Sequence, residues 1–392
     1  MIRIFINGLA ASAGGGLTYL RNVIPQLAAR EDVRANVLMS GDLCHEFEQT
    51  ANVRFFEAKC PKGALGRLWG EQRELPAMIM RCGAQVLVSA GNFALWNSPV
   101  PQILLSRNSL YTSADFMRDV EERGDYAIWI DTLLKGWLAR QSIRVANATV
   151  APSGAFAGEL SEWSGKKTIA IHHGFDEEAF TADKTPLPAD VQAKLDEGRD
   201  AVRLLFVSHY NYYRNFETLL RAMPILSRRL KGRRIRLYLT CRLSSGANPG
   251  SYRTDAAYGL LKTVREHSEI IELGSVPYRS LHHLYRACHI YVAPAYTESF
   301  AHPLVEAMSS GLPIVASDLA VHREICGNAG IYFAKFSPQD LAESVAHVCR
   351  SSELSRGLAE NGRRRVLDFS WKKHVALLLT LAETLAGAGS VQ

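Results

Sequence analysis

One stretch in the last third of the chain constrains the fold most strongly. Residues 290–294 form an apolar run that is typical of a strand buried on both faces. Pro303 lies where a helix can begin, because the missing N–H of proline would be unpaired in the first turn anyway. Gly311 and Pro313 end that helix, and residues 314–316 begin another strand. Two strands joined by one helix predict a parallel α/β sheet.

Two carboxylates flank the start of this predicted helix. Glu298 lies in the loop before it, and Glu306 lies within its first turn or so. Open α/β sheets bind ligands at the carboxyl ends of their strands, where a helix N-terminus attracts anions such as phosphate. Carboxylates repel phosphate but accept hydrogen bonds from hydroxyls. The spacing therefore indicates a ligand that carries both phosphate and sugar, with an ordinary βαβ unit and two solvated glutamates as the alternative.

Residues 298–318 resemble the glutamate–seven residues–glutamate signature of retaining glycosyltransferases of the GT-B fold, in the large family 4 group. The resemblance implies that Glu306 holds the ribose hydroxyls of a nucleotide and that Glu298 holds a sugar hydroxyl. Ala301 departs from the usual glycine but is the smallest available replacement. The resemblance also implies further donor-binding residues: Ser299, Phe300, Ala301, His302 and Leu304.

Strand and helix patterns alternate in both halves of the chain. The alternation predicts two doubly wound, Rossmann-like parallel sheets, with the ligand in a cleft between the halves. The predicted strands are 2–6, 35–39, 53–56, 85–89, 102–106, 149–152 and 168–171 in the first half, and 203–208, 234–240, 270–274, 290–294, 313–317 and 330–333 in the second.

The expected domain boundaries follow from this alternation. Residues 1–180 form an acceptor-side domain, and residues 202–371 form a donor-binding domain. The charged stretch 176–200, which contains Pro186 and Pro188, indicates a linker that we place at 181–201. Relatives end with a helix that kinks near an F-S-W sequence such as that at Trp371. The resemblance therefore implies that residues 372–392 cross back to the first domain.

Length and composition support a two-domain cytoplasmic protein. A chain of 392 residues exceeds the usual size of one domain. Its seven cysteines include no C-x-x-C pair, which favours a reducing compartment and argues against a zinc site. We expect no signal peptide, because the first residues form a strand pattern. No apolar stretch is long enough to span a bilayer.

A glycine-rich turn follows the first predicted strand. Gly14, Gly15 and Gly16 lead directly into a helix, so backbone N–H groups there can approach a ligand closely. The turn matches neither the dinucleotide-binding nor the P-loop pattern. Its placement resembles the family loop that touches the donor diphosphate, which implies donor-binding roles for Gly15 and Gly16. A plain flexible turn is the alternative.

A basic residue opens the second half. Arg214, followed by Asn215, resembles a family loop in which the basic side chain binds the donor diphosphate, and a guanidinium offers phosphate a bidentate, permanently charged fork. Many relatives carry a second arginine where this chain has Ser208. Ser208 or His209 would replace that second arginine by donating hydrogen bonds to the donor. The alternatives are a solvated charge for Arg214 and a packed core histidine for His209.

The acceptor side rests on fewer residues. The strand at 102–106 ends at Arg107 and Asn108, where the histidine common in relatives is absent. By resemblance, Asn108 would hydrogen-bond sugar hydroxyls and Arg107 would meet an anionic acceptor. Glu71, in a segment similar to several bacterial members, would line the acceptor cleft. The alternatives are an exposed strand end for the first two residues and surface helix capping for Glu71.

Two basic regions raise the question of membrane contact. Residues 228–236 form a dense cationic cluster, and residues 125–145 form an amphipathic helix with Trp129 and Trp137. Such features can dock a protein on anionic lipid. The favoured interpretation is that the helix packs on its own sheet and the cluster is solvated. No nucleic-acid recognition motif accompanies the net charge of +6.

These observations predict a retaining, metal-independent glycosyltransferase. It would transfer a sugar from a nucleotide diphosphate sugar to a hydroxyl of a glycan or lipid-linked glycan, using Glu298, Arg214 and Asn108. No metal or cofactor is expected, since the nucleotide sugar is a substrate. The expected partners are this donor, the glycan acceptor and, peripherally, the inner face of a membrane. The alternatives are a catalytically silent GT-B subunit that binds nucleotide sugars and a nucleotide-sugar 2-epimerase.

Overall fold

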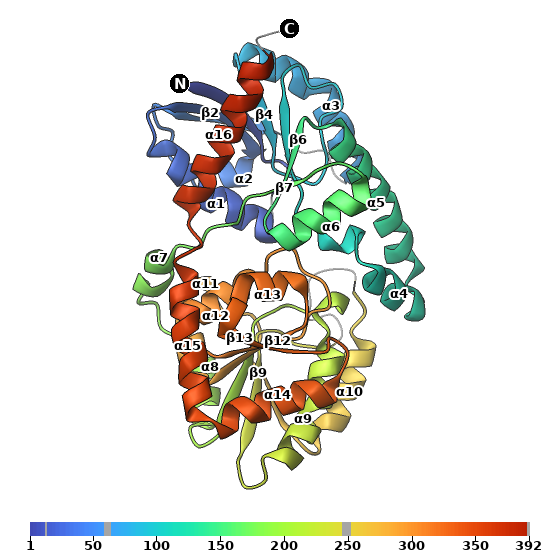
Figure 1. The fold of residues 1–392 in the computed structure, drawn as a ribbon, viewed down its shortest axis with the longest axis vertical. Coiled ribbons are helices and arrows are strands. Elements are labelled where there is room, and N and C mark those ends of the chain that lie inside the picture. The colour runs from blue at the N-terminus through green and yellow to red at the C-terminus, as the bar shows by residue number, and fades with distance from the viewer. Residues whose placement is uncertain (12–13, 59–63, 245–251, 390–392) are drawn as a thin grey trace. The chain divides into compact units, whose positions relative to one another are not determined.

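The computed structural model describes residues 1–11, 14–58, 64–244 and 252–389 (Figure 1). Contacts between residues divide the chain into two compact units. Unit 1 comprises Met1–Thr112, Ile130–Gly174 and the chain from Phe369 onward. Unit 2 comprises Ser113–Trp129 and Phe175–Asp368.

Unit 1 is built on a seven-stranded parallel sheet in the order β3-β2-β1-β4-β5-β6-β7. All seven predicted strands are present, so this part of the prediction is confirmed. Their bounds are β1 (Ile2–Asn7), β2 (Val33–Ser40), β3 (Val53–Ala58), β4 (Val86–Ser89), β5 (Gln102–Leu105), β6 (Ala148–Ala151) and β7 (Ile169–Ala170).

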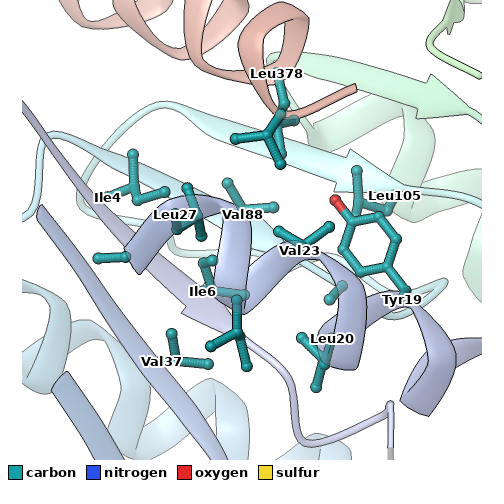
Figure 2. Close-up of a cluster of buried hydrophobic side chains, with 14 of the residues drawn as sticks. Ile4, Ile6, Tyr19, Leu20, Val23, Leu27, Val37, Val88, Leu105 and Leu378 are labelled. Atoms are coloured by element: carbon teal, nitrogen blue, oxygen red, sulfur yellow. The ribbon is translucent and has the colours of Figure 1, made fainter. Parts of the chain in front are cut away.

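Helices pack on the sheet of unit 1. The C-terminal helix α16 lies against α1, β1 and β4, and Figure 2 shows its Leu378 in one buried cluster with Val23 of α1 and Val88 of β4. The helices are α1 (Gly14–Ala28), α2 (Gly41–Cys44), α3 (Ala64–Arg81), the 3-10 helix η1 (Ser109–Tyr111), α5 (Tyr126–Val145, in this unit from Ile130), α6 (Gly154–Ser164) and α16 (Trp371–Gly389).

Unit 2 contains a six-stranded parallel sheet in the order β10-β9-β8-β11-β12-β13. All six predicted strands are again present. Their bounds are β8 (Val202–Phe206), β9 (Ile235–Leu239), β10 (Glu269–Glu272), β11 (Ile290–Ala293), β12 (Ile314–Ser317) and β13 (Gly330–Phe333).

Helices surround this second sheet in the lower part of Figure 1. They are α4 (Ala114–Glu122), α7 (Glu177–Ala182), α8 (Ala189–Asp196), the 3-10 helix η2 (Tyr212–Arg214), α9 (Phe216–Arg229), α10 (Asp255–Arg265), α11 (Tyr278–Arg286), α12 (His302–Ser309), α13 (Ala320–Cys326), the 3-10 helix η3 (Gly327–Ala329), α14 (Pro338–Arg350) and α15 (Ser352–Val366).

Both sheets reverse their winding direction at one strand pair. In unit 2, β8 pairs with β9 on one side and with β11 on the other, so the loops after β8 and β11 diverge from adjacent strands. In unit 1, β1 and β4 form the equivalent pair. Such topological switch points are where doubly wound sheets bind ligands. The predicted fold class, two Rossmann-like α/β sheets, is confirmed.

The units differ from the expected domains in their bounds. The predicted linker at 181–201 contains α8 and the end of α7, both within unit 2. Helix α4 belongs to unit 2 although it lies within residues 1–180. The units change at Gly174–Phe175, before the charged stretch, and charge and proline content could not show which unit a helix belongs to.

Candidate functional site

Arg214 and Glu298 meet at the switch point of unit 2. Arg214 ends the 3-10 helix after β8, Glu298 lies in the loop after β11, and their side chains form an ion pair. The guanidinium also lies 4.9 Å from the centre of the Tyr213 ring. Burial disfavours the cation, but the Glu298 carboxylate holds the pKa of Arg214 above its usual value. Burial raises the pKa of Glu298, and Arg214 opposes that rise.

Asn215 fixes the loops that carry this pair. Its backbone is left-handed, with φ of 55°, a conformation that asparagine tolerates better than most residues. Its side-chain amide donates to the carbonyl of Pro294 at 3.0 Å and to that of Lys335 at 2.6 Å. The loops after β8, β11 and β13 are thereby held together. The Nε–H of Arg214 is buried without a hydrogen-bond partner among the described residues, which leaves one donor for a ligand.

Glu306 is the second buried carboxylate. It is the fifth residue of α12, just past the first turn in which it was expected, and is 7% exposed. The Tyr285 hydroxyl of α11 donates to its Oε2 at 2.8 Å. Burial raises the pKa of Glu306 to about 7, and the bond from Tyr285 limits that rise. Sequence reasoning missed Tyr285, because it lies on another helix and only the fold brings it to Glu306.

The loop between Glu298 and α12 carries the other predicted donor residues. Ala301 adopts φ 66° and ψ 66°, the left-handed conformation that explains why glycine is usual in the motif. Phe300 and Leu304 are buried, whereas Ser299 and His302 are half-buried. The ring of Phe300 lies 4.8 Å from that of His302. Pro303 is in the first turn of α12, as predicted.

Ser208 and His209 follow β8 in the same unit. The Ser208 hydroxyl donates to the His209 carbonyl at 2.8 Å, and the Ser208 N–H donates to Thr240 Oγ1 at 2.9 Å. His209 is exposed, which excludes the packed core histidine considered above. Partial desolvation and the nearby Arg214 lower the pKa of its imidazole. His209 is therefore a neutral hydrogen-bonding group near neutral pH.

In unit 1, Arg107 joins three loops at the carboxyl edge of the sheet. Its guanidinium donates to the carbonyl of Ala90 after β4 and, at 3.3 Å, to that of Gly15 after β1. It lies 5.0 Å from the centre of the Tyr19 ring. Burial lowers the pKa of Arg107. Arg107 was expected to meet an acceptor. In the structure, its guanidinium donates to the backbone of the glycine-rich turn and so helps to hold that turn in place.

The two predicted glycines differ in what surrounds them. A Cβ at Gly16 would lie 2.7 Å from the Cα of Ala11, so that position requires glycine. A Cβ at Gly15 would meet nothing within 4 Å. Close packing therefore explains Gly16, whereas Gly15 is exposed and open to a ligand.

Asn108 and Glu71 each have a structural partner in unit 1. The Asn108 side chain accepts from the Leu110 N–H at 3.0 Å and so caps η1. Glu71 Oε2 accepts from the Asn7 side-chain amide at 2.9 Å, at the end of β1. Capping uses the side-chain carbonyl oxygen of Asn108, and its side-chain amide also bonds with the Tyr111 hydroxyl. The structure brings Arg107 and Gly15 together, while Asn108 and Glu71 remain separate predictions.

Among the described residues, no group of three His, Cys, Asp or Glu side chains could hold a metal ion. The six cysteines that lie in described residues are free thiols. His173 packs in an aromatic cluster with Tyr19, Trp371 and His374. The ring of His172 lies 5.7 Å from that of Phe369, so both histidines take part in packing.

Comparison with known proteins finds similarity mainly in the second unit. Residues 190–365 match the family model described as glycosyl transferases group 1. The O-antigen chain mannosyltransferase B of Escherichia coli is 31% identical over 129 residues, which are 31% of this chain and 32% of that protein. The alignments with the first curated relatives span about a third to a half of those proteins' length. Residues 190–365 thus form a glycosyltransferase-type domain.

Solved structures share the whole fold. Sucrose-phosphate synthase from Thermosynechococcus elongatus has a TM-score of 0.76 at 17% identity and covers 99% of this chain and 100% of its own. HepE of Anabaena, solved in complex with UDP-glucose, has a TM-score of 0.71 at 16% identity and covers 98% of this chain and 100% of its own. At this identity the likeness shows the fold, which is GT-B.

The strain at Ala301 predicts an unusual stabilising substitution. Left-handed backbone costs a residue with a Cβ roughly 1–2 kcal/mol, and the extra freedom of glycine in the unfolded chain returns about 0.4–1 kcal/mol. Ala301→Gly should therefore raise the free energy of unfolding by up to about 1 kcal/mol in urea denaturation. The control Ala307→Gly, in the interior of the same helix, should lower it by about 1 kcal/mol or more. Equal effects of the two substitutions would contradict this account.

The pKa of Glu306 predicts a pH dependence of stability. Its carboxyl binds a proton more tightly in the folded protein, where the pKa is about 7, than in the unfolded chain, where it is near 4.5. Stability from this group is therefore present below pH 4.5 and is lost as pH rises through 7. Relative to Glu306→Gln, the ligand-free wild type should lose on the order of 2 kcal/mol between pH 5 and 8. The exposed Glu360→Gln should show no such difference, and parallel pH profiles for Glu306→Gln and wild type would contradict the assignment.

Proposed function

We propose that the protein is a retaining glycosyltransferase that needs no metal ion or cofactor. It would move a sugar from a nucleotide diphosphate sugar to a hydroxyl of a glycan or lipid-linked glycan. The observation that carries the proposal is the buried Arg214–Glu298 pair at the switch point of a glycosyltransferase-type sheet, with Glu306 buried in the helix that follows the Glu298 loop. The names of the relatives support it, since one is an O-antigen chain mannosyltransferase and another was solved with UDP-glucose.

Each buried group suits one part of such a donor. Glu306 would accept hydrogen bonds from the ribose hydroxyls, with Tyr285 fixing one of its oxygens. Glu298 would accept from a hydroxyl of the sugar. Arg214 and the N–H groups at the start of α12 would bind the diphosphate, because a cation and a helix N-terminus both stabilise negative charge.

The proposed reaction retains the anomeric configuration without a protein nucleophile. The anomeric C–O bond of the donor breaks, and its electron pair leaves with the nucleoside diphosphate. The acceptor oxygen forms the new bond on the same face, and its proton passes to the departing phosphate oxygen. Arg214 would stabilise the charge that grows on that phosphate, which is the contribution expected of an oriented cation.

Residues of unit 1 would serve both substrates. The exposed backbone at Gly15 would approach the diphosphate, and Gly16 would shape the turn. Asn108 would donate from its side-chain amide to sugar hydroxyls. Arg107 and Glu71 would stand on the acceptor side, where the fixed position of Arg107 would favour an anionic acceptor.

A panel of donors tests this function. Incubation with UDP-, GDP- and dTDP-sugars should release nucleoside diphosphate from one donor when an acceptor extract is present. Glu306→Ala should weaken binding of that donor about ten- to a hundredfold, because hydrogen bonds to charged groups contribute roughly 1.5–3 kcal/mol. The control Glu360→Ala, at an exposed side chain, should bind it as the wild type does.

Other outcomes separate the alternatives. A donor that is converted without any acceptor would indicate a nucleotide-sugar 2-epimerase. Binding without turnover in every membrane extract would indicate a silent GT-B subunit. If no nucleotide sugar binds, or if Glu306→Ala binds donor as tightly as wild type, the proposed site is wrong.

We further propose that unit 1 contacts the inner face of an anionic membrane through α5. The helix buries Thr132, Ala139 and Ile143, but its other face exposes large apolar side chains, contrary to the favoured interpretation from the sequence. The exposed fractions are 52% for Ile130, 61% for Leu134 and 57% for Trp137.

Charge on the same helix supports this contact. Arg140 and Arg144 are exposed toward the C-terminal end of α5, as in helices that lie in a lipid interface. In the other basic region, 228–236, three cations form ion pairs: Arg229 with Glu343, and Arg234 and Arg236 with Glu269. No described helix is long and apolar enough to cross a bilayer. The proposal therefore concerns peripheral binding by a protein at the cytoplasmic face.

Vesicle flotation tests the membrane contact. The wild type should float with vesicles rich in phosphatidylglycerol and should bind neutral vesicles weakly. The double variant Leu134→Ser and Trp137→Ser should lower the bound fraction more than tenfold, because each buried apolar side chain contributes roughly 1.5–3 kcal/mol. Leu377→Ser, at an exposed leucine of α16, is the matched control. Equal flotation of the double variant and the control would show that α5 is not the contact.

A further inference from the structure

Helix α4, which belongs to unit 2, has a row of charged side chains along one face, called the stripe below. Asp115, Asp119 and Arg123 are four residues apart, so they lie on one face of the helix and its C-cap. Phe116 and Val120 on the adjoining face are fully buried. Ser113 caps the N-terminus by accepting from the Phe116 N–H at 3.2 Å. The helix is thus anchored by apolar packing, which leaves the charged stripe to make specific contacts.

The stripe reaches three loops at the carboxyl edge of the second sheet. Asp115 pairs with Lys335 after β13, and Asp119 accepts from the Tyr296 hydroxyl after β11 at 2.7 Å. Arg123 lies 4.3 Å from the centre of the Tyr212 ring in the 3-10 helix after β8. These three loops are the ones that Asn215 also joins.

Arg123 is the centre of this contact. It donates to Asp119 at 2.7 Å and to Glu217, near the start of α9, at 3.0 Å. Glu217 also accepts from the Tyr210 hydroxyl at 3.2 Å. The side chains of Arg123 and Glu217 are only 20% and 11% exposed, so water screens them weakly. Without the cation, two partly buried carboxylates would lack their shared partner.

The same loops carry the donor-site pair. Tyr212 and Arg214 are the first and last residues of one 3-10 helix. Tyr296 precedes Glu298 by two residues, and its N–H donates to the Tyr213 carbonyl at 3.0 Å. The α4 contacts at Tyr212 and Tyr296 therefore hold the two loops on either side of the Arg214–Glu298 pair.

We infer that α4 positions the donor site, with Arg123 as the positioning residue that acts through Arg214 and with Asp119 as its link to the Glu298 loop. The inference rests on the proposed function, since it assigns to α4 the placement of the cation that binds the donor diphosphate. An element from the first half of the chain thereby sets donor affinity in the second sheet.

Donor binding and turnover in a set of variants test this role. Arg123→Gln should weaken binding of the nucleotide sugar about tenfold, a common size for coupling between separate sites. Tyr296→Phe, which removes only the hydroxyl bond to Asp119, should change donor KM in the same direction and leave acceptor KM unchanged. Glu121→Gln is the control, because Glu121 lies on the same helix, is exposed and is outside the stripe. It should bind donor as the wild type does.

Non-additivity distinguishes positioning from general destabilisation. In an Arg214→Gln background, Arg123→Gln should weaken donor binding no further, because residues that act through one another do not add. If Arg123→Gln does not fold, Tyr296→Phe replaces it in the same cycle. Wild-type donor affinity in both variants, or effects that add to that of Arg214→Gln, would overturn the inference. Failure of the wild type to bind any nucleotide sugar would instead overturn the proposed function, and the inference with it.

Discussion

The ion pair between Arg214 and Glu298 is the contact on which the arrangement of unit 2 depends. Either charge alone would be buried without compensation at the centre of the sheet edge, which is strongly destabilising. The pair forms because the loops after β8 and β11 leave adjacent strands at the switch point. Asn215 and α4 then hold those loops from two sides. The Arg214 side chain is already oriented before a diphosphate binds. Binding would therefore cost little conformational entropy at this side chain.

In unit 1 the partially buried arginine is Arg107, and its partners are backbone carbonyls instead of a carboxylate. Arg107 gathers the loops after β1 and β4 by donating to the carbonyls of Gly15 and Ala90. Neutral carbonyls do not cancel its charge, so burial lowers the pKa of this guanidinium, whereas Glu298 raises that of Arg214. Among the described residues, an arginine thus lies at each switch point. Arg107 is paired with backbone carbonyls and Arg214 with a carboxylate.

Much of the fold could be predicted because periodicity is local. Apolar runs bounded by glycine and proline located all thirteen strands, and Pro303 and Gly311 marked the helix that carries Glu306. The motif also drew attention to Ala301, whose left-handed backbone the structure shows. Contacts between distant segments could not be found in this way. Tyr285 reaches Glu306 from another helix, and α4 packs with a sheet whose strands begin eighty residues later. The exposed face of α5 was misjudged for the same reason, because an amphipathic pattern does not show which face is covered.

The sequence by itself determined the fold class and the residue types at the donor side, because strand periodicity, helix punctuation and the spacing of Glu298 and Glu306 are properties of neighbouring residues. Only the tertiary structure decided how those residues are charged and held. It paired Arg214 with Glu298, raised the pKa of Glu306 to about 7 by burial and placed Arg123 beside the loop of Arg214. Burial and long-range pairing depend on which elements pack together, and no window of sequence contains that information.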